Sequence, residues 1–330
     1  MTRQILEYHP VIGYRFIPNL KARIPHEGGG YLIQTNSSGF RCCHEFKTDP
    51  TPFMKRVLLF GDSYTAGDGV SNGQRYGDKI EALANAEVYN FGLPGTAPDQ
   101  HYLAFMEHAS KIRADLTMIT VLVENIRRIA ARYRPYQNEQ GNTVLFSKPY
   151  FTLINGSLEL HGVPVGREPI KEADLPEQSR EFVDTGGRFA SLRKIMNRVG
   201  LKDLTQRALH YQPLPEYDDP QNSYWLLMRA ILEKFIAAVP KPVVVMPLPL
   251  YQHVEGTADP SGYQSRFSEL ADSNPCLVHD PLPSLLKYSP TERRSFRFAQ
   301  DIHPTPAGHV AIAASLAPVV MDLLGMKKVT

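Results

Sequence analysis

Five short, mostly apolar segments constrain the fold of this chain more than any other feature of its sequence. They are RVLLF (56–60), EVYNF (87–91), LTMITVLV (116–123), PVVVMPLP (242–249) and CLVH (276–279). Continuous apolar runs bounded by turn residues are typical of strands buried on both faces, as in a parallel sheet covered by helices. Helix-length segments separate most of them, at residues 73–84, 97–111, 225–239, 261–272 and 305–324. We therefore predict an α/β doubly wound fold with three layers, α/β/α, around a mostly parallel five-stranded sheet.

Two segments interrupt this alternation of strands and helices. Residues 1–53 are rich in Pro, Gly and His, and predict an irregular N-terminal extension packed on the core, with one or two short strands. Residues 133–225 read as an insertion whose Asn155-Gly156 pair predicts a β-hairpin with a tight turn. The insertion falls at the edge of the sheet where open α/β folds bind ligands, so we expect a lid or a pocket element. The predicted core is the remainder, residues 54–132 and 226–330.

Charge and cysteine content exclude several classes of function. Lys and Arg total 36 against 34 Asp and Glu, which leaves a formal charge of +2 and no basic field for nucleic acid. Three cysteines, two of them adjacent at Cys42 and Cys43, provide neither a disulfide framework nor the spacing of metal ligands. We expect free, inert thiols, and no metal ion or organic cofactor.

Neither a leader nor a membrane span is predicted. The first residues contain no continuous apolar stretch behind a basic start, so the sequence predicts no signal peptide and a cytoplasmic location. The longest apolar tract, residues 309–326, contains Pro318 and Asp322, and is too short and too interrupted to cross a bilayer.

Ser63 lies where a nucleophile would be useful, directly after the first predicted strand in the sequence VLLFGDSYTAGDGV. The carboxyl ends of strands in an open parallel sheet face the functional crevice. A serine hydroxyl is nearly inert alone and needs a histidine base, oriented by a carboxylate. We interpret the neighbouring Asp62 as structural, because Asp at such a position commonly bonds to turn amides.

The sequence AQDIHPTPAGHV supplies a carboxylate and an imidazole together. Asp301 and His303 precede a predicted helix that begins near Thr305 and Pro306, which places both on a loop at the same crevice. The order Ser, Asp, His is one that serine hydrolases of α/β type use. His279 with Asp280 is a rival pair at the end of the fifth predicted strand, but no helix start follows it at the expected place.

Two further strand ends offer hydrogen-bond donors. Gly92 follows the second predicted strand, where a backbone N–H with no side chain beside it can approach a substrate closely. Asn125 follows the third and offers a side-chain amide. Acyl transfer needs donors aimed at the oxygen that becomes negative, so Ser63 N–H, Gly92 N–H and Asn125 are the candidate oxyanion hole.

Taken together, these motifs resemble the SGNH (GDSL-type) hydrolase family, over residues 54–132 and 226–330. GDSYTAGDG is similar to the family's nucleophile motif, NFGLPG to its glycine motif and DIH to its acid and base motif, whereas Ile126 follows Asn125 where the family usually has aspartate. The resemblance implies a flavodoxin-like fold with Ser63 as nucleophile, His303 as base and Asp301 as acid. D-x-H spacing is more reminiscent of relatives that act on O-acetyl groups of polysaccharides.

We therefore predict a serine esterase that hydrolyses small acyl esters, acetyl above all, on carbohydrates or other small molecules. Three alternatives remain at this stage. A lipase or thioesterase would need a long apolar groove, for which the polar insertion gives little support. The same site could transfer the acyl group to a sugar hydroxyl, as an O-acetyltransferase, or the chain could be a non-catalytic glycan-binding module on the same scaffold.

Overall fold

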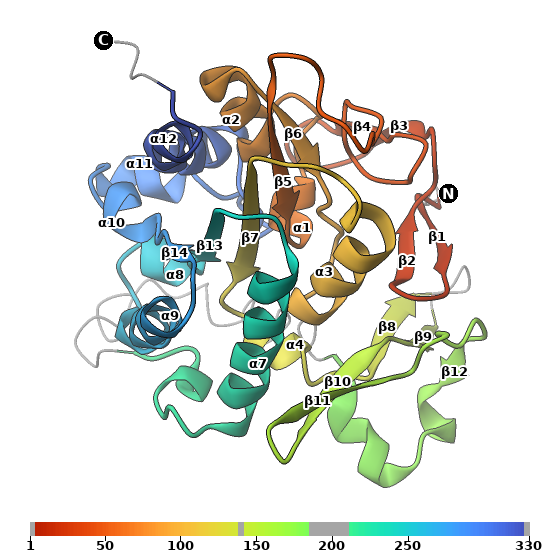
Figure 1. Cartoon of the computed structure of the whole chain (residues 1–330). Coiled ribbons are helices and arrows are strands. Elements are labelled where there is room, and N and C mark those ends of the chain that lie inside the picture. The colour runs from red at the N-terminus through yellow and green to blue at the C-terminus, as the bar shows by residue number, and fades with distance from the viewer. Residues whose placement is uncertain (1–3, 138–141, 185–210, 327–330) are drawn as a thin grey trace.

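The computed structural model describes residues 4–137, 142–184 and 211–326, and has a five-stranded, all-parallel sheet at its centre (Figure 1). In spatial order its strands are β14 (Leu277–Val278), β13 (Val243–Leu248), β7 (Leu116–Leu122), β5 (Lys55–Phe60) and β6 (Ala86–Asn90). If the five strands are numbered by their order in the chain and counted from the β6 edge, the sheet order is 2-1-3-4-5, which is the flavodoxin-like arrangement. The predicted fold class and all five predicted strands are confirmed.

The strands form where the sequence is continuously apolar, because both faces of the sheet are covered. Every residue of β7 and of β13 is buried, and only Lys55 of β5 is exposed. β5 lies between β6 and β7 in parallel register, so its carboxyl end is flanked by the ends of two neighbouring strands. The residues that follow β5 therefore start from the middle of the sheet edge.

The larger helices lie in two layers (Figure 1). On one face α2 (Tyr76–Ala84) packs against α12 (Pro306–Leu323), and on the other α3 (Pro98–Ala104) packs against α7 (Ser223–Ala238). α9 (Ser261–Ser273) leads to the edge strand β14. Short helices complete the connections: α1 (Ser63–Ala66), a π-helical turn at Phe105–Ala109, α4 (Asn125–Arg128), a 3-10 turn at Pro215–Tyr217, α8 (Tyr251–Val254), α10 (Leu282–Leu285) and α11 (Pro290–Arg294). The five predicted helices are confirmed, within a few residues at their ends.

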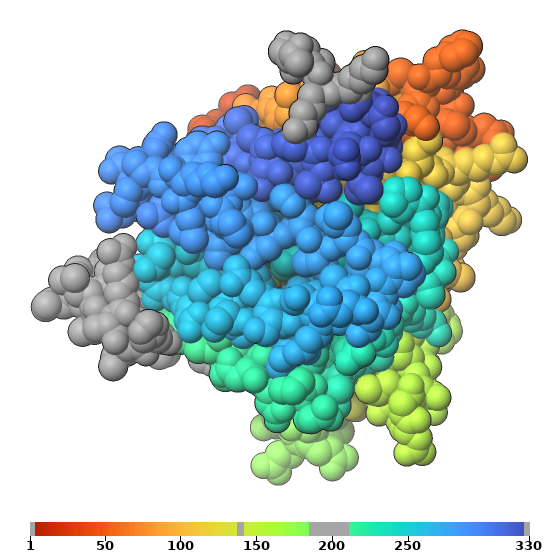
Figure 2. Space-filling view, turned by 60° about the vertical axis from the view of Figure 1, so that its left-hand side comes forward, coloured from red at the N-terminus to blue at the C-terminus, as the bar shows by residue number. Residues whose placement is uncertain are grey.

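α12 is the one described helix that is long and apolar enough to cross a membrane. Half of its residues are buried, and it packs on α2 and α10, as the core helix of a globular domain does. Figure 2 shows the face that the later part of the chain covers, with α12 (dark blue) along its upper edge. The length and hydropathy of α12 are thus explained by its place in the outer layer of the fold.

The N-terminal segment contains more strands than predicted. Two antiparallel hairpins occupy it, β1 (Leu6–His9) with β2 (Gly13–Phe16), and β3 (Lys21–Ile24) with β4 (Tyr31–Gln34). The expectation of one or two strands was wrong, because these four-residue strands show no continuous apolar run. They are recognised by alternation instead: Ile33 is fully buried, whereas Gln34 beside it is exposed.

The insertion forms two small sheets rather than a single hairpin. β10 (Tyr150–Ile154) and β11 (Ser157–His161) form the hairpin with Asn155-Gly156 as its turn, and both turn residues have positive φ, as predicted. β9 (Thr143–Ser147) pairs with β8 (Tyr133–Gln137) and β12 (Ile170–Lys171) instead. Only Lys148 and Pro149 separate β9 from β10, and proline cannot adopt the positive φ that a two-residue hairpin turn needs. Two 3-10 turns follow, at Glu172–Asp174 and Glu177–Phe182, and residues 185–210 of the insertion lie outside the described residues.

Candidate active site

Ser63 is the first residue of α1, at the carboxyl end of β5. Asp62 is the N-cap of this helix, and its side chain accepts the N–H of Tyr64 at 3.0 Å. A side chain at Gly61 would collide with the hydroxyls of Thr65 and Thr120, so the turn requires glycine. As the first helical residue, Ser63 has a backbone N–H without an intrahelical acceptor. The structural role expected for Asp62 agrees with this contact.

Asp301 and His303 lie on a loop between α11 and α12. The prediction placed this loop directly after the last strand, but α10 and α11 intervene. An isolated antiparallel bridge joins Arg297 to Pro304, and the Phe298 N–H donates to the His303 carbonyl at 3.2 Å. The loop then enters α12 at its N-cap, Thr305, so the base-bearing segment (residues 295–305) is held at both ends.

The structure brings Ser63, His303 and Asp301 into one hydrogen-bonded row, although 240 positions of sequence separate the serine from the histidine. His303 Nε2 lies 2.8 Å from Ser63 Oγ, and His303 Nδ1 lies 2.5 Å from Asp301 Oδ1. Ser63 is only 8% exposed. A ring that bonds a hydroxyl through one nitrogen and a carboxylate through the other is arranged to take a proton from that hydroxyl.

The electrostatics of the row favour a charged histidine. Burial alone would lower the pKa of His303, but the hydrogen bond that His303 donates to Asp301 and the charges of Asp68, Asp301 and Asp62 raise it above its ordinary value. Burial would raise the pKa of Asp301, yet the hydrogen bonds and charge of His303 and a hydrogen bond from His26 hold it well below its usual range. Asp301 is therefore ionised at neutral pH, and an imidazolium formed at His303 is stabilised by its surroundings.

The glycine predicted as an oxyanion donor packs tightly against the nucleophile helix. A Cβ at Gly92 would meet the backbone of Thr65 and Ala66, so only glycine lets the end of β6 lie flush on α1. Its N–H donates to Asn90 Oδ1 at 2.8 Å. This N–H thus already has an acceptor in the structure.

The asparagine predicted as a donor is fully buried at the end of β7 and starts α4. Asn125 Nδ2 lies 3.3 Å from Asp62 Oδ2, and its Oδ1 accepts from Arg128 Nη1 at 2.8 Å. Because Arg128 fixes the oxygen, the amide nitrogen faces the nucleophile turn. One of its two hydrogens is directed at Asp62, and the other has no acceptor recorded in the described part of the chain.

The rival histidines have structural partners elsewhere. His279 Nε2 lies 3.0 Å from Ser315 Oγ, and Asp280 accepts from Tyr263 and Gln264. The pair is therefore not part of the row at Ser63. His309 is fully buried in α12, and its Nδ1 accepts the N–H of Tyr76 at 3.2 Å, so it is a packed core residue.

Sequence reasoning missed the part that the N-terminal segment plays around these loops. Arg41 is fully buried and donates to the carbonyls of Gly67 and Val70, at 2.7 and 2.8 Å, just beyond the nucleophile helix. His26 and Glu27 reach the base-bearing loop. No local pattern marks these residues, because each acts on a loop distant in sequence.

An apolar pocket lies beside the base-bearing loop, and its volume of about 480 Å³ includes solvent space at its open mouth. Tyr64, Ile302 and Phe296 line it, and the Tyr64 hydroxyl donates to the Ile302 carbonyl at 2.9 Å. Neither Ser63 nor His303 contributes to its wall. The pocket therefore borders the site without containing the reactive atoms.

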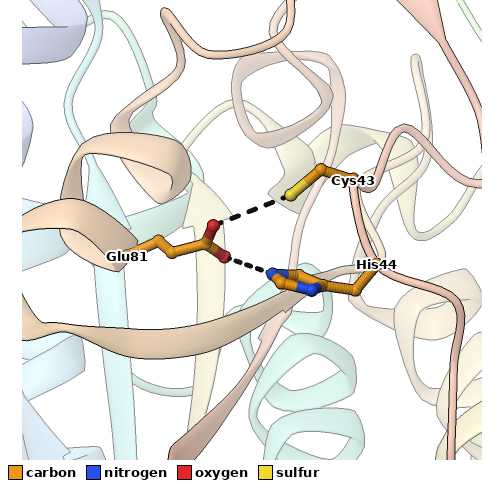
Figure 3. Close-up of side chains that lie close together, drawn as sticks. All are labelled: Cys43, His44 and Glu81. Atoms are coloured by element: carbon orange, nitrogen blue, oxygen red, sulfur yellow. Dashed lines mark hydrogen bonds and ion pairs between the residues drawn. The ribbon is translucent and has the colours of Figure 1, made fainter.

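Among the described residues, one group has ligand atoms close enough to share a metal ion: Cys43, His44 and Glu81 (Figure 3). His44 Nε2 lies 2.8 Å from Glu81 Oε2. Hydrogen bonds with Cys43 and Glu81 raise the pKa of His44 to about 10, so the ring is protonated at neutral pH and a metal would have to displace that proton. A hydrogen bond with Cys42 raises the pKa of Cys43 too. The group is explained as an ion pair that joins the N-terminal segment to α2.

Comparisons with known proteins give one family match and several similar solved structures. Residues 59–311 match the family described as GDSL-like Lipase/Acylhydrolase. Similar solved structures include an acetylxylan esterase from Geobacillus stearothermophilus, at 14% identity and a TM-score of 0.43, covering 86% of this chain and 98% of that one. Another similar structure is a member of the lipolytic protein G-D-S-L family from Veillonella parvula, at 14% identity and a TM-score of 0.42. The match covers 80% of this chain and 97% of that one. Comparison with curated proteins gives no match.

Proposed function

Because the chain belongs to the GDSL-like lipase/acylhydrolase family and is a serine ester hydrolase, we propose that its nucleophile is Ser63, its general base His303 and its orienting carboxylate Asp301. One observation carries this assignment. The imidazole of His303 bonds Ser63 Oγ at 2.8 Å and Asp301 Oδ1 at 2.5 Å at the same time. That is the geometry that a base requires before it can remove the serine proton.

The proposed reaction proceeds in two steps. Ser63 Oγ attacks the ester carbonyl while His303 Nε2 takes its proton, and the imidazolium then protonates the departing alcohol. A water molecule next attacks the acyl enzyme and gives a proton to His303. His303 passes this proton to Ser63 Oγ as the bond between Ser63 and the acyl group breaks, and the free acid leaves. Throughout, Asp301 holds the proton on Nδ1 of His303 and stabilises the positive ring.

The oxyanion of the tetrahedral intermediate needs donors near Ser63. The Ser63 N–H has no acceptor within its helix, and Asn125 Nδ2 faces the nucleophile turn. These two groups are therefore the main proposed donors to the oxyanion. Gly92 N–H would have to share its hydrogen with Asn90 Oδ1 to take part.

A small acyl group, acetyl above all, is the proposed substrate moiety. The 8% exposure of Ser63 supports this, because only a small part of the nucleophile is open to solvent. The alcohol part that we propose is a carbohydrate, on the ground of the D-x-H spacing between Asp301 and His303.

The test compares hydrolysis of 4-nitrophenyl acetate, butyrate and octanoate by the wild type, Ser63→Ala and His303→Ala. We expect acetate to be the best substrate and each variant to be slower by at least about 10³-fold in kcat. Release of acetate from acetylated xylo-oligosaccharides, followed by an enzymatic acetate assay, tests the carbohydrate. Equal slow rates in all three proteins would remove Ser63 and His303 from the chemistry, and failure to label with a fluorophosphonate would indicate a silent binding module.

A further inference from the structure

The loop between β3 and β4 lies against the base-bearing loop and contacts it through two consecutive residues. His26 Nε2 lies 3.2 Å from Asp301 Oδ2, the carboxylate oxygen that His303 does not use. Glu27 accepts the backbone N–H of Asp301 and of two residues before it. Residues 275 positions apart in sequence thus meet beside the reactive row.

The hydrogen bonds of His26 define which nitrogen carries its proton. The Gly28 N–H donates to His26 Nδ1 at 3.2 Å, so this nitrogen is the acceptor of the ring. A neutral imidazole has one acceptor and one donor nitrogen, and Nε2 is therefore the N–H that donates to Asp301. Asp301 then accepts one imidazole N–H on each of its carboxylate oxygens.

Packing holds the His26 ring at this place. It lies edge-on to Phe298, with centroids 4.4 Å apart, and edge-on to Tyr31 at 5.8 Å. A Cβ at Gly69, which follows the nucleophile helix, would lie 2.7 Å from Phe298 and 3.2 Å from His26. The ring is therefore enclosed by the N-terminal segment, the base-bearing loop and the residues that follow the nucleophile helix. Only 12% of its side chain is exposed.

Glu27 fixes the backbone on which Asp301 stands. Its carboxylate accepts the N–H of Ala299 at 3.1 Å, of Gln300 at 3.0 Å and of Asp301 at 2.6 Å. Amide donors bonded to a charged acceptor are among the stronger hydrogen bonds in proteins. With these contacts, the position of the loop is set from outside the segment that carries the base.

We propose that His26 and Glu27 are positioning residues of the esterase: Glu27 fixes the loop at 299–301, and His26 orients the Asp301 carboxylate so that Oδ1 meets His303. The proposal rests on the proposed function of Ser63, His303 and Asp301. A carboxylate held at one oxygen alone can rotate about its side-chain bonds, whereas one held at both oxygens presents a constant direction to its partner. The carboxylate of the catalytic row is thus oriented by His26, a positioning residue from outside the part of the chain that matches the family.

The experiment compares His26→Leu with His26→Gln. Leucine fills the space without a donor, whereas the glutamine amide can place an N–H close to the position of Nε2. We expect His26→Leu to lower kcat for 4-nitrophenyl acetate by roughly 10- to 100-fold with KM within about twofold, the loss typical of removing an orienting partner. His26→Gln should retain activity within a few-fold of wild type.

The pH profile separates positioning from general loss of structure. In wild type the charges of Asp301, Asp68 and Asp62 raise the pKa of His303, against burial that lowers it. If Asp301 turns away in His26→Leu, His303 loses part of the interaction that raises its pKa, while the lowering effect of burial remains. The pKa of His303 then falls, and the acid limb of the kcat/KM profile moves to lower pH. A variant that only contains more unfolded protein would keep the wild-type midpoint at reduced amplitude.

Arg23→Ala is the matched control, because Arg23 is exposed on the same hairpin and contacts only the carbonyl of Gly29 among its recorded partners. It should leave kcat and the acid limb unchanged. Wild-type kinetics in His26→Leu, or equal losses in the Leu and Gln variants of a folded protein, would overturn the proposal. Ser63→Ala, measured in parallel, distinguishes the failures: activity that survives it contradicts the proposed function, whereas activity lost there but intact in His26→Leu contradicts only the positioning role.

Discussion

The N-terminal segment and the insertion both lie outside the alternating core, yet they are joined to it differently. The N-terminal segment places His26, Glu27 and Arg41 directly against the two loops that hold Ser63, Asp301 and His303. Several contacts join the insertion to the core, and two of them are ion pairs with little exposure. Lys148 forms a buried ion pair with Asp99 of α3 at 2.6 Å, and Asp184 lies 3.3 Å from Arg128.

The comparison shows that the amount of regular secondary structure in a segment does not indicate whether it contacts the catalytic residues. The insertion has longer strands and was expected to supply a lid or a pocket element. Among the described residues, it contacts the neighbourhood of Asn125 through Arg128, which meets Asp184 and Lys148, and through Arg127, which pairs with Glu216. The irregular N-terminal segment supports both halves of the reactive row. We therefore expect substitutions in the insertion to lower mainly stability, and substitutions in the N-terminal segment to lower catalysis as well.

Removing the cation that anchors the insertion should produce the largest loss of stability. Lys148 and Asp99 are both almost fully buried. Burial raises the pKa of Asp99 above its ordinary value, although the Lys148 charge opposes this rise. Lys148→Met leaves a buried carboxylate without its cation, so we expect about 3–5 kcal/mol less free energy of unfolding in urea. The kcat of the folded fraction should stay within about threefold of wild type.

The double variant Lys148→Met, Asp99→Leu is the control for this prediction. Replacing both partners by apolar side chains should recover most of the lost free energy, because no buried charge remains. A large drop in kcat with unchanged stability would contradict the anchoring role and bring the insertion into the catalytic site.

Removing the buried cation of the N-terminal segment should affect both properties. Arg41→Met deprives the carbonyls of Gly67 and Val70 of their donor, at a cost of roughly 1 kcal/mol for each bond, or about 2–3 kcal/mol in all. We also expect kcat to fall by about tenfold, because the loop after Ser63 loses its support. Unchanged kcat in the folded protein would make Arg41 a purely structural residue.

The pH dependence of wild-type activity should show the effect of the core carboxylates Asp301, Asp68 and Asp62 on the pKa of His303. The base must be neutral to accept the serine proton, so kcat/KM should rise with pH as His303 loses its proton. Since the pKa of His303 is raised, the midpoint should lie above the ordinary value of about 6.5. A midpoint below it would mean that burial, rather than Asp301, Asp68 and Asp62, controls the ring.

The smallest effect should come from the second anchor of the insertion. Asp184→Asn weakens its contact with Arg128, which keeps its hydrogen bonds to Asn125 and to the Thr96 carbonyl. We expect the free energy of unfolding to fall by about 1 kcal/mol, kcat to change by less than about threefold, and the pH midpoint to stay at the wild-type value. A tenfold loss of kcat would show instead that the insertion orients Asn125 through this arginine.

The core was predictable because its signals are local. Each buried strand is a continuous apolar run, and the functional residues Ser63, Asn125 and His303 stand next to strand or helix boundaries that the sequence marks. The Asn155-Gly156 turn was predictable for the same reason, since the type of turn depends on those two residues.

The remainder depends on contacts between distant segments. β8 contains Pro135 and polar residues, and β9 pairs with it because the Lys148-Pro149 connection cannot form a tight hairpin turn toward β10. Nothing near His26 predicts that it meets Asp301. Only the folded chain shows that the Gly92 N–H already has an acceptor in Asn90.

The wide separation of Ser63 from His303 has a consequence for protein synthesis. The ribosome completes the nucleophile turn, and the arginine that supports it, long before it adds Asp301 and His303. A chain interrupted anywhere between these points contains an inert serine, because nothing is present to remove its proton. Esterase activity in a cell extract would therefore report translation through the last loop, and abortive fragments would release no acid from esters.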